Sequence, residues 1–295
     1  MRCSLKGKYK KDFQLKKSKL YHTDIVTVGD EVSLDLNNDG SGIIHTIGER
    51  RNYLSRKAPR IRGASYRGER LEQVVASNID NFFIISSVDE PPFNNRVIDR
   101  FIVAGESSNI NMVIIINKID LDDMNKMDTW INLYDNIGYN VIKTSTLNST
   151  GLPELASLLK NKTNIFWGQS GVGKSSLLNK IYPHLNLETS PISNSTFKGV
   201  HTTVTSKLFE VETDTFLIDT PGIREIDPFG IKKEDLSHYF IEFKAYAAEC
   251  KFSTCTHHHE PDCKVRRAVE QSKISKERYD SYLRLLETIE EDIIF

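Results

Sequence analysis

The sequence predicts a multidomain α/β protein in which a small β unit comes before a largely parallel sheet and a helical unit comes after it. Three observations support this prediction. They are an alternating apolar segment with a turn near the N-terminus, four buried strand patterns separated by helical segments, and a cluster of cysteines and histidines ahead of a charged C-terminal helix. A length of 295 residues suits two or three domains, and 39% hydrophobic with 27% charged residues suits a globular protein.

The N-terminal unit is predicted from a hairpin pattern. Residues 32–36 alternate apolar and polar side chains, residues 37–42 supply turn chemistry, and residues 43–47 are again largely apolar. Together with a strand expected over residues 25–28, this pattern favours a short β-barrel, an architecture that often binds oligonucleotides.

Charge separates this unit from the rest of the chain. Residues 1–70 hold 16 Lys and Arg against 8 Asp and Glu, a net charge of +8, whereas residues 71–295 hold 23 against 32, a net charge of −9. A basic surface favours a polyanion such as nucleic acid, because neutralised phosphates release counterions. Basic residues from 50 to 70, with Tyr53 and Tyr66 among them, could clamp phosphates and stack on bases. The alternatives are a solvated lysine-rich surface and a polar interdomain linker.

The central unit is predicted from apolar runs that alternate with helical segments. Strands are expected over residues 82–88, 112–116, 164–167 and 216–218, which indicates a largely parallel sheet. The run over residues 112–116 is the longest apolar stretch, and the lysine-rich first twenty residues have no apolar core. We therefore expect neither a membrane span nor a secretory signal.

A phosphate-binding loop is predicted directly after the strand over residues 164–167. The segment fits G-x-x-x-x-G-K-[ST] and leads into helical residues. Its glycines let backbone N–H groups face phosphates, its lysine reaches the outer phosphates, and the next serine can bind Mg²⁺. The predicted contact residues are Gly168, Gln169, Ser170, Gly171, Val172, Gly173, Lys174, Ser175 and Ser176.

A second phosphate motif follows the strand over residues 216–218. Asp219 begins a D-x-x-G sequence that ends at Gly222, so the aspartate can hold Mg²⁺ through water and the glycine N–H can contact a γ-phosphate. A polar segment between the two motifs contains Thr202 and Thr203. We expect Thr203, or else Thr202, to complete the Mg²⁺ shell together with Ser175 and Asp219.

Guanine recognition is predicted at the end of the strand over residues 112–116. Asn117, Lys118 and Asp120 fit N-K-x-D, and the aspartate can accept hydrogen bonds from N1–H and the 2-amino group of guanine, which adenine does not offer. Thr144, Ser145 and Thr146 follow another short apolar segment and are expected in a second base-contacting loop, with Ser145 and Thr146 as the base contacts.

The order of these motifs is unusual. In most GTPases the phosphate loop comes first, then the threonine, D-x-x-G and N-K-x-D. Here N-K-x-D at 117 precedes the phosphate loop at 168 and D-x-x-G at 219. The sequence therefore predicts a circularly permuted GTPase domain. Ile223 follows D-x-x-G and cannot orient water, so His201 is the nearest candidate for that role, with a solvent-exposed histidine as the alternative.

A metal site is predicted near the C-terminus. Cys250, Cys255 and Cys263 lie within fourteen positions, and His257, His258 and His259 lie among them. Three thiolates and one imidazole would complete a closed tetrahedral Zn²⁺ site, which is the structural kind. The alternative is a set of free thiols.

Taken together, the basic barrel, the permuted domain with G-x-H-T-T at residues 199–203 and the Cys/His cluster resemble the bacterial ribosome small-subunit-dependent GTPase family (RsgA, also called YjeQ or YloQ) over essentially the whole chain. The resemblance implies an OB-fold RNA-binding domain over residues 1–68, a permuted P-loop GTPase domain over 69–223, and a helical zinc-binding domain over 224–295. It selects His257 as the zinc ligand and supports His201 as catalytic. Thr146 and Thr220 depart from the residues usual in the family.

The resemblance also implies a cytoplasmic enzyme that hydrolyses GTP to GDP and phosphate in late maturation of the 30S subunit. Its partners are the 30S subunit and 16S rRNA, its cofactors are one structural Zn²⁺ and Mg²⁺ with GTP, and a monomer without DNA or membrane contacts is expected. One alternative is a GTP-gated RNA-binding scaffold with incidental hydrolysis. Another is a zinc-dependent nucleic-acid enzyme, which a site closed by four protein ligands does not favour.

Overall fold

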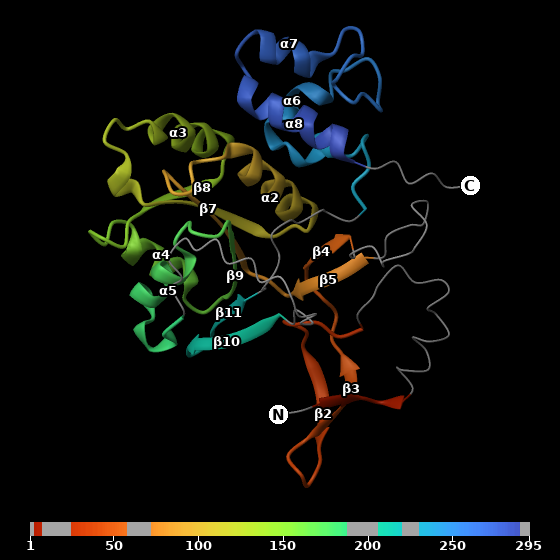
Figure 1. The fold of residues 1–295 in the computed structure, drawn as a ribbon. Coiled ribbons are helices and arrows are strands. Elements are labelled where there is room, and N and C mark those ends of the chain that lie inside the picture. The colour runs from red at the N-terminus through yellow and green to blue at the C-terminus, as the bar shows by residue number, and fades with distance from the viewer. Residues whose placement is uncertain (1–2, 8–24, 58–71, 188–205, 220–229, 290–295) are drawn as a thin grey trace, which may run out of the picture.

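The computed structural model describes residues 3–7, 25–57, 72–187, 206–219 and 230–289 (Figure 1). Three sheets form within these residues. The predicted boundaries at 68/69 and 223/224, the basic segment from 58 and the site residues His201, Thr202, Thr203 and Gly222 lie outside the described residues.

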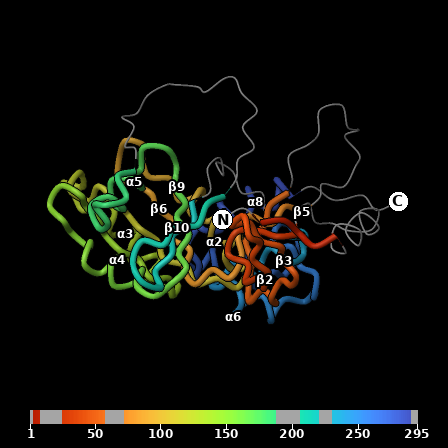
Figure 2. The backbone as a smooth tube through the Cα atoms, turned by 90° about the horizontal axis from the view of Figure 1, so that it is seen from below, coloured from red at the N-terminus to blue at the C-terminus, as the bar shows by residue number. Residues whose placement is uncertain are grey.

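The N-terminal part contains the predicted hairpin. β2 (Val32–Leu36) pairs antiparallel with β3 (Gly42–Ile47), which also pairs parallel with β1 (Cys3–Leu5). β4 (Tyr53–Lys57) pairs with β5 (Glu72–Ser77). Because the described strands form a sheet of three and a separate pair, the closed barrel stays a prediction. Figure 2 shows β2 and β3 at the end of the molecule away from α3, α4 and α5.

The strand expected over residues 25–28 is wrong, because a side chain organises a turn there instead. Asp30 accepts a hydrogen bond from Thr27 N at 2.8 Å and forms an ion pair with Arg50 Nε at 2.6 Å. Local side-chain to backbone bonds of this kind compete with strand pairing.

The central sheet has six strands in the order β10-β11-β9-β6-β7-β8. All neighbours are parallel except the edge strand β10, which runs antiparallel to β11. The four predicted strands are confirmed. The bounds are β6 (Asn81–Ser87), β7 (Asn111–Asn117), β8 (Asn140–Thr144), β9 (Thr163–Gly168), β10 (Lys207–Glu212) and β11 (Thr215–Asp219).

Helices cover both faces of this sheet (Figure 1). α2 (Asn95–Ser107) and α3 (Met127–Ile137) pack on the face that includes Phe82 and Ile84, whereas α4 (Leu152–Leu159) and α5 (Lys174–Ile181) pack on the face that includes Phe83 and Ile85. Successive residues of a buried strand point to opposite faces, which is why β6 is apolar throughout its centre. The parallel strands therefore bring their carboxyl ends to one edge of the sheet.

The C-terminal part is helical, as predicted, and its described residues 230–289 contain no strand. Its core includes Phe240, Phe243, Tyr282 and Leu286, and it also takes in Val103 of α2. No described helix combines the length and the apolar character that crossing a membrane requires. The elements are η3 (Leu236–Tyr239), η4 (Ile241–Phe243), α6 (Lys244–Ala247), α7 (Lys264–Glu270) and α8 (Lys276–Thr288).

Candidate functional site

The phosphate loop connects the end of β9 to the start of α5. Gly171 and Gly173 have positive φ values of 87° and 95°, which favour glycine. Gly173 has a second constraint, because a Cβ atom there would lie 2.3 Å from Asn117 Nδ2. The predicted loop therefore forms at the carboxyl edge of the sheet, where a phosphate-binding loop needs to lie.

The ammonium group of Lys174 lies over this loop. Its Nζ donates to Gln169 O at 2.9 Å and also to Gly168 O. Burial lowers the pKa of Lys174 to about 8, and the Asp219 carboxylate opposes this shift. Lys174 is half-buried and has no carboxylate ion pair in the described part of the chain, so its ammonium group is suited to bind an anion.

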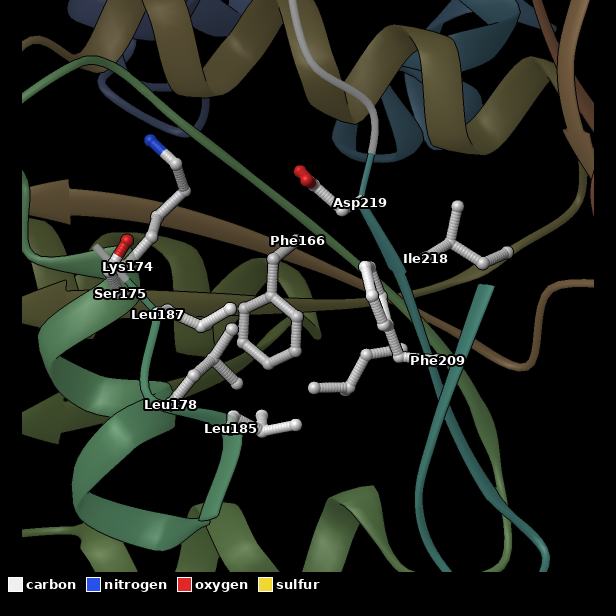
Figure 3. A pocket seen from close by; sticks show the side chains of 10 residues that line it. Phe166, Lys174, Ser175, Leu178, Leu185, Leu187, Phe209, Ile218 and Asp219 are labelled. Atoms are coloured by element: carbon white, nitrogen blue, oxygen red, sulfur yellow. The ribbon is translucent and has the colours of Figure 1, made fainter. Parts of the chain in front are cut away.

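A cavity of about 290 Å³ lies beside Lys174, Ser175 and Asp219. Figure 3 shows these polar side chains beside and above the rings of Phe166 and Phe209, which lie in the middle of the view. A hydroxyl and a carboxylate are the oxygen ligands that Mg²⁺ prefers. These residues therefore fit the predicted Mg²⁺ position beside the phosphate loop, whereas the predicted threonine ligands lie outside the described residues.

The N-K-x-D residues lie at the same edge of the sheet. Asn117 ends β7 and is almost fully buried, and its Nδ2 donates to Val172 O of the phosphate loop at 2.7 Å. Thr144 Oγ1 donates to Asn117 Oδ1 at 2.9 Å, which fixes the amide. Asn117 thus links the N-K-x-D segment to the phosphate loop.

The neighbouring residues complete this corner. Lys118 takes a left-handed backbone conformation with φ of 58°, and its Nζ donates to Glu90 O. Ser145 Oγ donates to the Asp120 carboxylate, which lies in η1 (Ile119–Leu121). The structure therefore brings the two predicted base-contacting segments together, while the Thr146 side chain forms no hydrogen bond within the described part of the chain. Thr144 belongs to the predicted second loop, but its contact with Asn117 and the contact of Glu90 with Lys118 were not predicted, because the paired residues are 27 and 28 positions apart.

The cysteine and histidine cluster also assembles. One donor atom from each of Cys250, Cys255, His257 and Cys263 lies within 4.8 Å of all the others, which is compatible with a metal ion at their centre. His257 Nδ1 lies 3.3 Å from Cys263 Sγ and 3.6 Å from Cys250 Sγ. His258 and His259 are exposed, so the geometry favours His257 over the two chemical alternatives.

The electrostatics of this cluster suit a cation. Burial lowers the pKa of His257 and favours the neutral imidazole that binds metal. Burial raises the pKa of Cys255 to about 12, and it also raises the pKa of Cys263. Bringing such thiols together as thiolates requires a positive charge among them, which a metal ion supplies.

Two tyrosines of α8 hold the loop that carries the cysteine and histidine cluster. Tyr279 OH donates to His257 O at 2.7 Å, and Tyr282 OH donates to Thr256 O at 2.5 Å. The Glu260 carboxylate caps the loop by accepting from Thr256 N at 2.7 Å and from His258 N at 3.1 Å. Although burial opposes the shift, these hydrogen bonds hold the pKa of Glu260 at about 2. The sequence predicts a charged helix here, but the hydroxyl contacts of these two tyrosines were not predicted.

Comparison with known proteins agrees with this geometry. A family model described as RsgA GTPase matches residues 47–229. The small ribosomal subunit biogenesis GTPase RsgA of Phocaeicola vulgatus is 40% identical over 98% of this chain and 90% of its own length. The protein of that name from Chlorobaculum parvum is 40% identical over 91% of this chain and 87% of its own length.

Two solved structures are similar over most of the chain. The crystal structure of YjeQ from Thermotoga maritima has a TM-score of 0.73 and 33% identity, and the match covers 97% of this chain and 88% of that one. The structure of YloQ, described as a circularly permuted GTPase, has a TM-score of 0.66 and 30% identity, with coverage of 91% and 83%.

Proposed function

The chain belongs to the RsgA GTPase family, and from this premise we propose that it couples hydrolysis of GTP to the maturation of the small (30S) ribosomal subunit. The observation that carries the proposal is the meeting of Asn117, Asp120 and Lys174 at one edge of the sheet in permuted chain order. The curated relatives carry the name small ribosomal subunit biogenesis GTPase.

The guanine base is recognised by Asp120, whose carboxylate is oriented by Ser145. Rejection of adenine follows because adenine leaves the carboxylate without donors, and an unpaired charged group is costly. Asn117 holds the base-reading segment against the phosphate loop, and the Lys118 stem covers the base. Thr146 belongs to the same second loop.

The triphosphate is bound by the loop from Gly168 to Ser176 and by the N–H of Gly222. Mg²⁺ neutralises charge on the phosphate oxygens when it is bound, and Ser175, Asp219 and Thr203 (or Thr202) hold it. His201 orients the attacking water, which adds directly to the γ-phosphorus as GDP leaves. The alternative of a scaffold with incidental hydrolysis is not favoured, because Lys174, Ser175 and Asp219 are all present at the site.

Zn²⁺ is the metal that best suits three thiolates and one imidazole. Four protein ligands close the site, so its role is structural and no position is left for metal-assisted hydrolysis. The protein acts as a monomer in the cytoplasm, and its binding to 16S rRNA depends on the N-terminal basic unit.

Phosphate release from GTP tests this proposal, measured with and without purified small subunits, with ATP and large subunits as controls. Stimulation by small subunits alone is expected, and it should fall about 10²- to 10⁴-fold in His201→Ala while GTP affinity is retained. His184→Ala, in η2 (Pro183–Leu185), is the matched control and should behave as the wild type. Stimulation by large subunits, or by neither, would contradict the proposal.

A further inference from the structure

A basic groove lies between α2 and α8, separate from the cavity beside Ser175 and Asp219. Its volume is about 340 Å³, and its lining includes Arg96 and Arg100 from α2, Arg284 from α8, and Gln169 of the phosphate loop. We call this the arginine groove. A smaller adjoining cavity shares Arg100 with it and reaches Lys57 at the end of β4.

The charge of the arginine groove is one-sided. Among the residues that the structure describes, no aspartate or glutamate lines it. Within the described part of the chain, none of the guanidinium groups of Arg96, Arg100 and Arg284 forms an ion pair or a hydrogen bond with a carboxylate. The sequence offers Asp280 and Glu287 near Arg284 on α8, yet neither lines the groove.

The position of Arg96 adds to the positive charge of the arginine groove. Arg96 lies in the first turn of α2, which contains no acidic residue. The N-terminal end of a helix carries partial positive charge and favours anions, so a cation there is unfavourable unless an anion binds beside it. Arg100 follows one turn later on the same side, which places two guanidinium groups along one wall.

The two walls of the groove are held in place by buried contacts beneath it. Arg278 Nη1 of α8 lies 2.6 Å from Asp99 Oδ1 of α2, and both side chains are fully buried. Asn95 Nδ2 of α2 donates to Ser281 Oγ of α8 at 3.2 Å. Because these contacts fix α8 against α2, an anion binds to walls already in position, and little ordering of the helices opposes binding.

Resting on the function proposed above, we infer that the arginine groove binds the phosphodiester backbone of an RNA strand of the small ribosomal subunit. Guanidinium groups bind phosphate oxygens through paired N–H donors, and three of them along an open groove suit successive phosphates of a chain. Gln169 places the bound strand beside the phosphate loop. This contact lies outside the N-terminal basic unit.

The test is the salt dependence of RNA binding by the full-length protein. The probes are a labelled single-stranded RNA of about twenty nucleotides and purified small subunits, each titrated at several KCl concentrations. The variant R96Q/R100Q/R284Q is compared with K160Q/K162Q/K180Q, which removes the same charge from exposed lysines on the α4 and α5 side of the sheet. If the triple variant does not fold, the double variant R96E/R284E, which changes only exposed residues, is measured in its place.

We expect the groove variant to lose about tenfold or more in affinity for both probes and to lower the slope of log K against log salt by about two to three, since each phosphate contact contributes about 0.7 to 0.9. The control should keep the wild-type slope. In stimulated hydrolysis, more small subunits should be needed for half-maximal rate, with the maximal rate unchanged.

An unchanged slope and affinity in the groove variant would overturn the inference while leaving the proposed function intact. Weaker subunit binding with an unchanged slope and unchanged RNA binding would also overturn it, because the groove would then contact a protein. If small subunits do not stimulate GTP hydrolysis by the wild type, the proposed function is wrong instead. The affinity for the RNA oligonucleotide still tests whether the arginine groove binds RNA.

Discussion

Arg278 and Asp99 form an ion pair of 2.6 Å between two fully buried side chains that are 179 residues apart in the chain. Arg278 also donates to both carboxylate oxygens of Glu242, at 2.7 and 3.0 Å, and Tyr134 OH donates to Asp99 at 2.8 Å. These four residues join α2 and α3 of the nucleotide-binding domain to η4 and α8 of the C-terminal domain. Burial opposes the charge, but Asp99 and Glu242 raise the pKa of Arg278 above its ordinary value.

Replacing Arg278 should strongly destabilise the protein. Arg278→Met leaves the Asp99 and Glu242 carboxylates without their cation, and breaking a buried pair from one side costs about 3–5 kcal/mol. Denaturant unfolding measures this loss. Arg284→Met removes an exposed arginine from the same helix and should change stability by no more than about 0.5 kcal/mol. Equal stability of the two variants would exclude a structural role for the buried pair.

This pair marks the limit of what the sequence could predict. The phosphate loop, N-K-x-D and the cysteine cluster were predictable, because each needs particular residue types at short spacing. The partners of Arg278 come from helices far away in sequence, and only the packing of α8 on α2 makes that arginine a core residue. The same holds for Ser145 and Asp120, which are 25 residues apart.

The errors have a similar cause. Residues 25–28 have strand-like composition, but Asp30 organises a turn through Thr27 and Arg50. β10 was not predicted because most of its residues are exposed, so it lacks the buried apolar run of the other strands.

Removing the charge of Lys174 should stabilise the nucleotide-free protein. Burial lowers the pKa of Lys174 from 10.5 to about 8 in the folded chain, so unfolding takes up a proton between those values. Wild-type stability therefore rises with pH across this interval, and the cost of burying the charge is largest below pH 8. Lys174→Met should gain up to about 3 kcal/mol at pH 7, since one pKa unit corresponds to about 1.4 kcal/mol.

This gain should shrink as the pH rises above 8, which unfolding at several pH values would reveal. Lys180→Met changes an exposed lysine of the same helix and should show no such pH dependence. If Lys174→Met is no more stable than the wild type at pH 7, burial of the charged ammonium group does not lower the stability of the protein. GTP binding should be lost in Lys174→Met and kept in Lys180→Met.

Asp120→Asn should change the preferred base. The asparagine amide cannot accept hydrogen bonds from both N1–H and the 2-amino group, but it can donate to the 2-oxo group of xanthine. We expect GTP affinity to fall by about 100-fold or more and affinity for xanthosine triphosphate to rise. Ser145→Ala retains the carboxylate and should only weaken GTP binding. If Asp120→Asn still prefers GTP, Asp120 does not contact the base.

Cys255→Ser should remove the bound metal and unfold the C-terminal domain. Loss of one of four ligands weakens a structural site, and the small core around Phe243 and Tyr282 depends on the loop that the metal holds. Metal analysis and limited proteolysis report the two effects, which a zinc chelator should reproduce in the wild type. Cys3→Ser, in exposed β1, is the control and should retain the metal. A full metal content in Cys255→Ser would rule out this ligand set.

The most direct test of the central claim is the nucleotide dependence of binding to the small ribosomal subunit. Purified protein and small subunits are sedimented together with GDP or with a GTP analogue that resists hydrolysis. A nucleotide-timed maturation factor should sediment with subunits in the presence of the analogue and be released with GDP, and Lys174→Met should lose this difference. Equal binding in both nucleotide states would contradict the account, because hydrolysis could then not time release.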